Sequence, residues 1–272
     1  MKKKLAILDL YDSTPNQGMR CIQEIVKKFD RRVESQWFDV RGKGDVPSVE
    51  DFDIFIFSGG PGDPRDKFGT WDVKLYELFD NIWLSNQNSF APRKFAFFIC
   101  HSFQMAANHF NLVTITERKS PMFGTTRVRL TEDGRNDELF SELPNPFYAA
   151  DFRSYQAVQP DEEKLQGMGA EILALEKVRP NVDLERAVMG IRFSPEMIGV
   201  QFHPEADAPG MLRHFKSASM AVMIINEHGK DKLESMVRDL SHPEKIELTH
   251  KTILPTFIND AIGALKEELV LN

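Results

Sequence analysis

The chain has 272 residues, of which 42% are hydrophobic and 28% are charged, and its formal net charge is −7. This composition is ordinary for a soluble globular protein, and the acidic balance argues against a nucleic-acid partner, which would need a basic face. No run approaches the ~18 consecutive apolar residues of a membrane span. Asp9 and Asp12 end the first apolar stretch too soon for a signal peptide. We therefore expect a cytoplasmic protein that does not associate with a membrane.

The first part of the chain, up to about residue 112, alternates short apolar runs with helical patterns. Such alternation predicts a parallel sheet with helices on both faces. We expect strands at 5–10, 33–40, 53–60 and 95–100, and helices at 18–29, 71–84 and 101–110.

The pattern changes after about residue 112, where short runs between Gly, Pro and Asp turns predict a mostly antiparallel region. We expect strands at 125–132, 145–152, 170–177 and 185–193, a buried strand at 197–202 and a helix at 210–229. The predicted fold class is α/β: a mostly parallel central sheet flanked by helices (flavodoxin-like, three-layer) with a small antiparallel β region. Residues 1–229 form the main domain, and residues 230–272 form a helical C-terminal extension packed on it.

Cysteine usage limits the chemistry further. Cys21 and Cys100 are the two cysteines, too few for a disulfide framework, so both are expected to be free thiols. Cys21 falls on the apolar face of a predicted helix and is expected to be inert packing. No C-x-x-C or H-E-x-x-H motif occurs, so we expect neither a metal site nor a cofactor.

Cys100 ends an apolar run and starts a helical pattern in KFAFFICHSFQ, residues 94–104. A nucleophile at such a turn is lifted out of the sheet, beside backbone N–H groups and the positive end of a helix dipole that favour a thiolate. Taken alone, a cysteine at a strand end is more often a buried core residue. Cys100 is therefore a candidate nucleophile that needs partners.

Two further segments supply such partners. His203 and Glu205 follow a buried run in IGVQFHPE, and alternation along the chain can place the carboxylate where it orients the imidazole. The loop SGGPGDP, residues 58–64, can aim a backbone N–H at a developing oxyanion. The loop is not a phosphate loop, since no G-K-[ST] follows it. A thiol, a base with its orienting acid and a glycine loop are the parts of acyl transfer through a thioester.

The order and spacing of the three segments resemble the class I (triad-type) glutamine amidotransferases, in the form of a stand-alone, GMP synthase glutaminase-like chain. That family shows a GGPG or NGPGDP loop, then a G-I-C-x-G-x-Q elbow, then a late H-P-E. Here these stand as SGGPGDP (58–64), FICHSFQ (98–104) and GVQFHPE (199–205). The resemblance covers roughly residues 5–225.

The resemblance implies that glutamine or a γ-glutamyl compound is the substrate. Cys100 would attack the side-chain amide carbon, His203 would act as base and then as acid, and Glu205 would orient His203. The backbone N–H groups of Gly60 and His101 would form the oxyanion hole, with the side chain of His101 incidental. Substrate-binding residues would be Gly62, Gln104, Ser154 and Tyr155. A synthetase partner would receive the ammonia.

Phe98 and Ser102 replace the two glycines of the family's elbow. Phe98 either fills space near the pocket or displaces the elbow backbone and misaims an oxyanion donor. Three functions therefore stay open. The protein could be a glutaminase or amidotransferase, it could be a γ-glutamyl hydrolase with the same triad, or it could be a catalytically weak protein with a regulatory or binding role.

Overall fold

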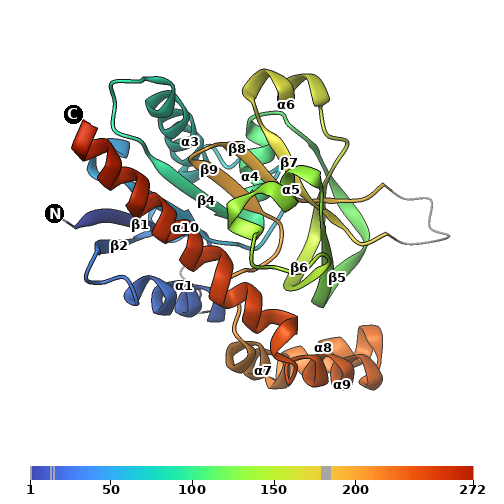
Figure 1. The fold of residues 1–272 in the computed structure, drawn as a ribbon. Coiled ribbons are helices and arrows are strands. Elements are labelled where there is room, and N and C mark those ends of the chain that lie inside the picture. Colours follow the sequence, from blue (N-terminus) through green and yellow to red (C-terminus); the bar gives the residue numbers. More distant parts are fainter. Residues whose placement is uncertain (1, 13, 15, 179–184, 272) are drawn as a thin grey trace.

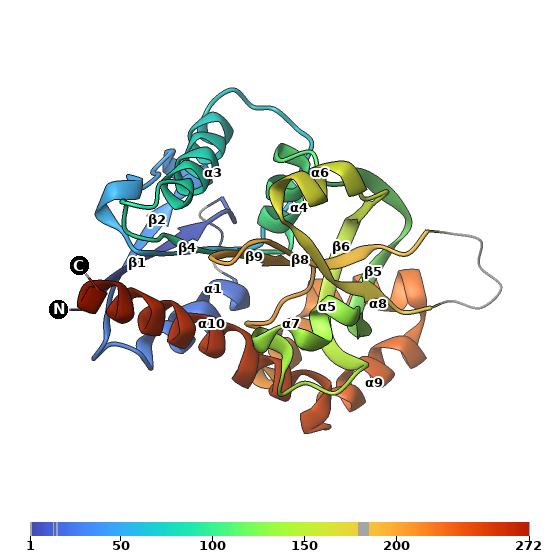
Figure 2. The same cartoon turned by 45° about the horizontal axis from the view of Figure 1, so that its top comes forward.

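The computed structural model describes residues 2–12, 14, 16–178 and 185–271. A nine-stranded sheet in the order β2-β1-β3-β4-β9-β8-β6-β5-β7 forms the centre of the molecule. Figures 1 and 2 show α3, α4 and α6 on one side of this sheet and α1 and α10 on the other. The predicted α/β class is confirmed.

The strands lie at the following positions: β1 Lys3–Asp9, β2 Val33–Asp39, β3 Ile54–Phe57, β4 Phe95–Ile99, β5 Thr114–Leu130, β6 Phe147–Val158, β7 Glu171–Glu176, β8 Val188–Ser194 and β9 Met197–Val200. The helices are α1 Gln17–Lys27, α2 Val40–Lys43, α3 Trp71–Gln87, α4 His101–His109, α5 Glu132–Asn136, α6 Glu162–Met168, α7 Ala208–Lys216, α8 Ala218–His228, α9 Lys230–Asp239 and α10 Pro243–Leu271. Two 3₁₀ turns, η1 Val49–Asp51 and η2 Glu138–Phe140, complete the described elements.

The parallel half of the sheet brings the three sequence motifs to one edge. Strands β2, β1, β3, β4 and β9 run parallel to one another. Phe57 of β3 is level with Phe98 of β4, and Phe98 is level with Gly199 of β9. Because parallel strands end at the same edge, the glycine loop after β3, Cys100 after β4 and His203 after β9 are placed side by side.

The antiparallel region is larger than predicted. Strands β5, β6, β8 and β7 pair antiparallel around a closed circuit, and β8 joins this circuit to β9. The sheet is therefore mixed rather than mostly parallel, and the flavodoxin-like expectation was wrong for this half. The physical reason is that β5 uses both of its edges: residues 128–130 pair with β7, and the opposite edge pairs with β6. The strand also runs for 17 residues, and its part before residue 125 extends the pairing with β6.

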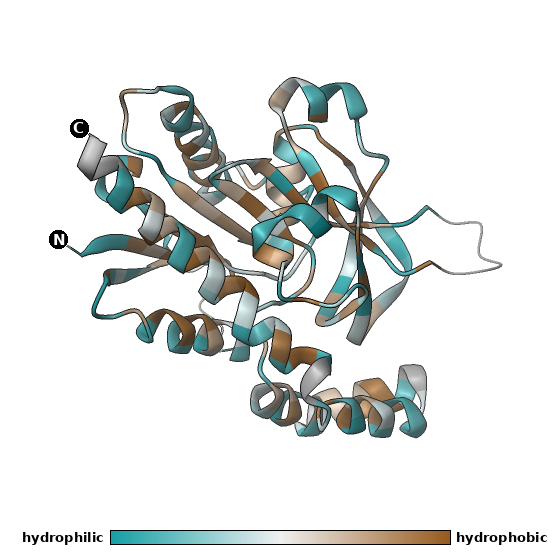
Figure 3. Ribbon diagram, viewed as in Figure 1, coloured by the Kyte–Doolittle hydropathy of each residue, from teal (hydrophilic) through white to brown (hydrophobic). Residues whose placement is uncertain are grey.

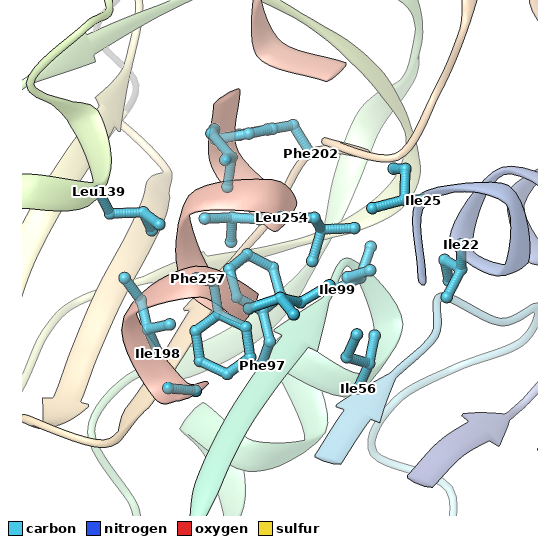
Figure 4. Close-up of a cluster of buried hydrophobic side chains, with 14 of the residues drawn as sticks. Ile22, Ile25, Ile56, Phe97, Ile99, Leu139, Ile198, Phe202, Leu254 and Phe257 are labelled. Atoms are coloured by element: carbon cyan, nitrogen blue, oxygen red, sulfur yellow. The ribbon is translucent and has the colours of Figure 1, made fainter. Parts of the chain in front are cut away.

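Two apolar layers cover the two faces of the sheet, because successive residues of a strand point to opposite sides. Phe97 lies in the layer under α1 and α10, where its ring centroid is 5.1 Å from that of Phe257 (Figure 4). Phe98 lies in the opposite layer with α3 and α4. In the hydropathy colouring the central strands are largely apolar, whereas the helices carry both apolar and polar residues (Figure 3).

The C-terminal residues fold as helices against the rest of the chain. The predicted single helix at 210–229 is wrong: Ser217 has extended backbone (φ −62°, ψ 141°) and separates α7 from α8. Gly229 does end α8. In α10 the apolar residues Ile253, Phe257 and Ile262 are buried in the core. The division of the chain at residue 229 stays a prediction.

Candidate active site

Cys100 occupies a sharp turn between β4 and α4. Its backbone has φ 50° and ψ −98°, a conformation that side-chain-bearing residues rarely adopt. The Cys100 N–H donates to the carbonyl of Val200 at 2.8 Å, and the Cys100 carbonyl accepts the first bond of α4 from the Gln104 N–H at 3.0 Å. The thiol therefore lies at the N-terminus of α4, and both the N–H and the carbonyl of Cys100 are hydrogen-bonded.

Ser102 secures this turn from inside. Its hydroxyl accepts from the Ile99 N–H at 2.8 Å and lies 3.0 Å from the carbonyls of Phe57 and Ile99. The side chain is fully buried, so a larger residue would have no room. Ser102 thus keeps the small size that the turn demands and adds hydrogen bonds to two neighbouring strands.

His203 and Glu205 form the pair predicted from the sequence. His203 Nδ1 lies 2.8 Å from Oε1 of Glu205, whose side chain is buried. The His203 backbone is anchored as well, because its N–H donates to the carbonyl of Ala150 in β6 at 2.8 Å. The ring is thereby fixed at its carboxylate partner and at its backbone.

The charges around His203 favour its protonated form. Burial opposes a charge on the ring, but the Glu205 carboxylate and then Cys100 together raise the pKa of His203 well above its ordinary value. The structure therefore brings Cys100, His203 and Glu205 into one interacting group, in the arrangement of a thiol, a base and an orienting acid.

The glycine loop after β3 packs closely against its neighbours. A Cβ at Gly60 would lie 2.6 Å from the carbonyl oxygen of Leu10, a distance that excludes any side chain. A Cβ at Gly59 would lie 2.8 Å from the Tyr11 hydroxyl and 2.9 Å from Cε1 of His203. Gly60 thus lets the loop backbone approach Leu10, and Gly59 lets it approach Tyr11 and the His203 imidazole.

The side chain of His101 is not incidental, contrary to the sequence-based interpretation. It is buried, and its Nε2 accepts from Arg41 Nη2 at 2.9 Å. Burial, followed by the Arg41 charge, lowers the pKa of His101 to about 3, so the ring is a neutral acceptor. Arg41 Nη1 donates to the carbonyl of Pro61 at 2.7 Å, and its guanidinium packs over Trp71. Arg41 therefore links the first residue of α4 to the glycine loop.

Cys100 lines two cavities. The first, which we call the β6 cavity, has a volume of about 550 Å³ and contains all four predicted substrate-binding residues in its wall, namely Gly62, Gln104, Ser154 and Tyr155. The second, the α1 cavity, has a volume of about 280 Å³ and lies between Cys100, the N-terminal part of α1 and α7. Gly60 lines both cavities, whereas His203 lines the α1 cavity.

The sequence profile described as "Glutamine amidotransferase class-I" matches residues 6–214. The chain belongs to the class I glutamine amidotransferase family. A search of curated proteins finds no match.

Several solved structures share the fold. A glutamine amidotransferase from Thermotoga maritima superposes with a TM-score of 0.67 at 15% identity, over 96% of this chain and 99% of the other. A putative GMP synthase subunit from Thermoplasma acidophilum gives 0.59 at 13% identity, over 100% and 98%. The CTPS glutaminase domain of Trypanosoma brucei with bound acivicin gives 0.58 at 13% identity, over 96% and 94%.

In this amidotransferase-family protein, Gln104 is part of a hydrogen-bond chain that ends at the Cys100 thiol. Its side-chain Nε2 donates to the carbonyl of Tyr155 and to Oε1 of Gln201, both at 2.9 Å. Gln201 in turn places its Nε2 3.7 Å from Cys100 Sγ. Gln201 lies inside the motif GVQFHPE, and its position two residues before His203 was the available signal for it.

Phe98 fills space away from the site. Its ring stacks on Phe57 at 4.7 Å and meets Phe79 edge-on at 5.0 Å, in the apolar layer under α3 and α4. Phe98 does not occur in the wall of either described cavity around Cys100. Of the two alternatives raised by the sequence, the structure fits filled space, and that space is core rather than pocket.

Other contributors to the site were missed at the sequence level. Tyr11 lies in the α1 cavity wall, and burial, then the Glu205 charge, raise its pKa well above the ordinary value. Cys21 was expected to be inert packing, but it lines the same cavity; burial, followed by Asp207 and Glu205, raises the pKa of its thiol to about 12. His250 of α10 contacts the Glu205 backbone. No short motif marks these residues.

Within the described part of the chain, no group of three or more His, Cys, Asp or Glu side chains is placed to hold a metal ion. In the same residues, no helix is long and apolar enough to cross a membrane.

Proposed function

We propose that this protein hydrolyses the side-chain amide of glutamine, or of a related γ-glutamyl compound, through a thioester on Cys100. The observation that carries the proposal is the hydrogen bond of 2.8 Å between His203 and Glu205, on an imidazole that also interacts with the Cys100 thiol. A base oriented in this way can activate a thiol and later protonate a leaving amine.

The reaction has two halves. Cys100 attacks the amide carbon, and the C–N bond breaks as His203 transfers its proton to the departing nitrogen. A water molecule, deprotonated by His203, then attacks the thioester, the C–S bond breaks, and glutamate leaves. The backbone N–H groups of Gly60 and His101 stabilise the oxyanion of both tetrahedral intermediates. His101 is the first residue of α4, where a backbone N–H has no partner within the helix.

The β6 cavity is the proposed site for the glutamyl part of the substrate. Gly62, Gln104, Ser154 and Tyr155 line it. The Gln104 amide hydrogens already bond Tyr155 and Gln201, so we assign Gln104 to shaping this cavity and leave its carbonyl oxygen for the substrate.

Released ammonia would pass to a synthetase partner. This proposal is supported by two structural relatives that are described as parts of synthetases, a putative GMP synthase subunit and a CTPS glutaminase domain. We propose a cytoplasmic location, because a nucleophilic thiol and the free Cys21 suit a reducing compartment.

The test combines labelling with turnover. A chloroketone analogue of glutamine should alkylate Cys100 and leave Cys21 unmodified, because the pKa of Cys21 is raised to about 12 and its thiolate is scarce. Cys100→Ala should lower ammonia release from glutamine at least about a thousandfold with an unchanged circular dichroism spectrum. Labelling at Cys21, or turnover retained in Cys100→Ala, would overturn the assignment. Absence of both labelling and turnover in the wild type would favour the regulatory alternative.

A further inference from the structure

The α1 cavity lies on the leaving-group side of Cys100. Cys100 and Gly60 line both cavities, but His203 lines the α1 cavity and is absent from the wall of the β6 cavity. The group that protonates a leaving nitrogen must lie within hydrogen-bond reach of it. If the glutamyl part of the substrate occupies the β6 cavity, its scissile nitrogen therefore points into the α1 cavity.

This cavity is far larger than ammonia requires. Its volume is about 280 Å³, whereas a cavity of roughly 10–15 Å³ on this measure already holds a water molecule. The additional volume can receive a substituent of several carbon atoms on the amide nitrogen. An ammonia molecule alone would leave most of this space unfilled.

The wall of the cavity selects the kind of substituent. Phe152, Ala206 and Met211 give it an apolar surface, and Glu205 and Asp207 contribute carboxylates. Among the described residues that line it there is no Lys or Arg. Its further histidine, His214, has a pKa lowered by burial and by His203, so it is neutral at pH 7. Glu205 already engages His203, and Asp207 already pairs with Arg20. A carboxylate on the amine would have to compete with these two carboxylates for the cations beside the cavity.

We propose that the preferred substrate is a γ-glutamyl amide of an apolar amine that bears no carboxylate, with the amine held in the α1 cavity. The proposal rests on the hydrolytic function proposed above. In the reaction the amide C–N bond breaks, His203 supplies a proton to the amine nitrogen, and water supplies the hydroxyl of the glutamate product. The products are glutamate and the free amine.

Three substrates test the proposal with the full chain: L-glutamine, γ-glutamyl-n-butylamide and γ-glutamylglycine. We expect kcat/KM for the butylamide to exceed that for glutamine by roughly tenfold. Each methylene in a fitted apolar pocket contributes about tenfold or more to discrimination. Much of this gain is offset by the conformational entropy that the flexible butyl chain loses when it binds. We expect γ-glutamylglycine to be at least tenfold poorer than the butylamide. Hydrolysis of glutamine without hydrolysis of the butylamide overturns this inference and leaves the proposed function standing. Hydrolysis of none of the three overturns both.

A matched pair of variants locates the amine. Met211→Trp narrows the α1 cavity and should lower the butylamide-to-glutamine ratio of kcat/KM at least tenfold. Met223→Trp narrows the β6 cavity, which both substrates share, and should leave the ratio unchanged while lowering both values. If Met211→Trp does not fold, Ala206→Leu narrows the same cavity and should act in the same direction. An unchanged ratio in a folded α1-cavity variant places the amine elsewhere and overturns the proposal.

Discussion

His250 of α10 donates a hydrogen bond from its Nδ1 to the backbone carbonyl of Glu205 at 2.8 Å. The carbonyl can only accept, so the proton lies on the histidine. α10 lies beyond residues 6–214 that match the family profile, yet its His250 bonds the residue that contacts His203. Thr249, the neighbour of His250, bonds the carbonyl of Tyr148 in β6 at 2.6 Å. The C-terminal helix is thus connected to the segment of His203 and Glu205 through side-chain hydrogen bonds as well as through the core.

His250→Ala should therefore loosen Glu205. We expect a loss of about 1 kcal/mol in the free energy of unfolding, the typical contribution of one intramolecular hydrogen bond, and a decrease in kcat of about tenfold with little change in KM. Urea unfolding and ammonia release measure the two effects. Lys251→Ala, at the adjacent exposed position, is the control and should change neither by much. Wild-type kcat in His250→Ala would show that α10 only covers the core.

Arg41 should act as a positioning residue for the oxyanion hole, because it bonds both His101 and the carbonyl of Pro61. Arg41→Ala should lower kcat by about tenfold to a hundredfold, less than the loss of an oxyanion donor itself, and should leave KM nearly unchanged. Arg41→Lys can reach one of the two partners and should recover part of the loss. Lys43→Ala, on the same short helix α2, is the matched control. A change confined to KM would contradict the positioning role.

Glu205→Gln should lower the pKa of His203. Burial disfavours the imidazolium, and the Glu205 carboxylate is the largest influence in its favour, so removal of that charge leaves burial to dominate. In the wild type this raised pKa contributes stability that is fully present below the ordinary histidine pKa of about 6.5 and is lost as pH rises through the folded value. The variant should lack that contribution.

Imidazole NMR of His203 across pH measures this shift directly, and urea unfolding at several pH values measures its effect on stability. Turnover at pH 7 should fall in Glu205→Gln and should fall further in His203→Ala, which removes proton transfer as well as its orientation. An unchanged His203 titration in Glu205→Gln would show that the 2.8 Å contact is structural.

Phe98→Gly should not raise activity, although glycine is the residue of the family's elbow. The Phe98 ring is fully buried against Phe57 and Phe79, and removal of a buried phenylalanine side chain costs about 3–5 kcal/mol. Phe98→Leu keeps most of the volume and should cost less. Thermal unfolding and ammonia release of both variants are the measurements. Increased turnover in Phe98→Gly would mean that the ring does distort the elbow.

Much of the site was present in the sequence because its requirements are local. Cys100 follows a strand and precedes a helix, so its position at the turn depends on neighbouring residues. The loop at Gly60 and the segment at His203 likewise follow buried strands. Parallel strands end at one edge of a sheet, so the prediction of parallel strands sufficed to bring these three segments together.

The extent of the antiparallel region was misjudged because it depends on strand pairing, which is not a local property. The pattern of β5 is interrupted between Glu117 and Met122, where its register against β6 shifts. A sequence pattern reports which residues alternate, but not which strand each part pairs with. The closed circuit of β5, β6, β8 and β7 follows from that pairing, and so it became visible in the folded chain alone.

By itself, the sequence located Cys100, His203 and Glu205 as the candidate group, because residue type and backbone position are properties of short segments. The tertiary structure decided what supports and surrounds that chemistry. Arg41 meets His101 across 60 positions of the chain, and His250 meets Glu205 across 45. Met211 and Cys100 line the same cavity. Side chains so far apart come together through the packing of whole helices and strands, and no local pattern records which of them will meet.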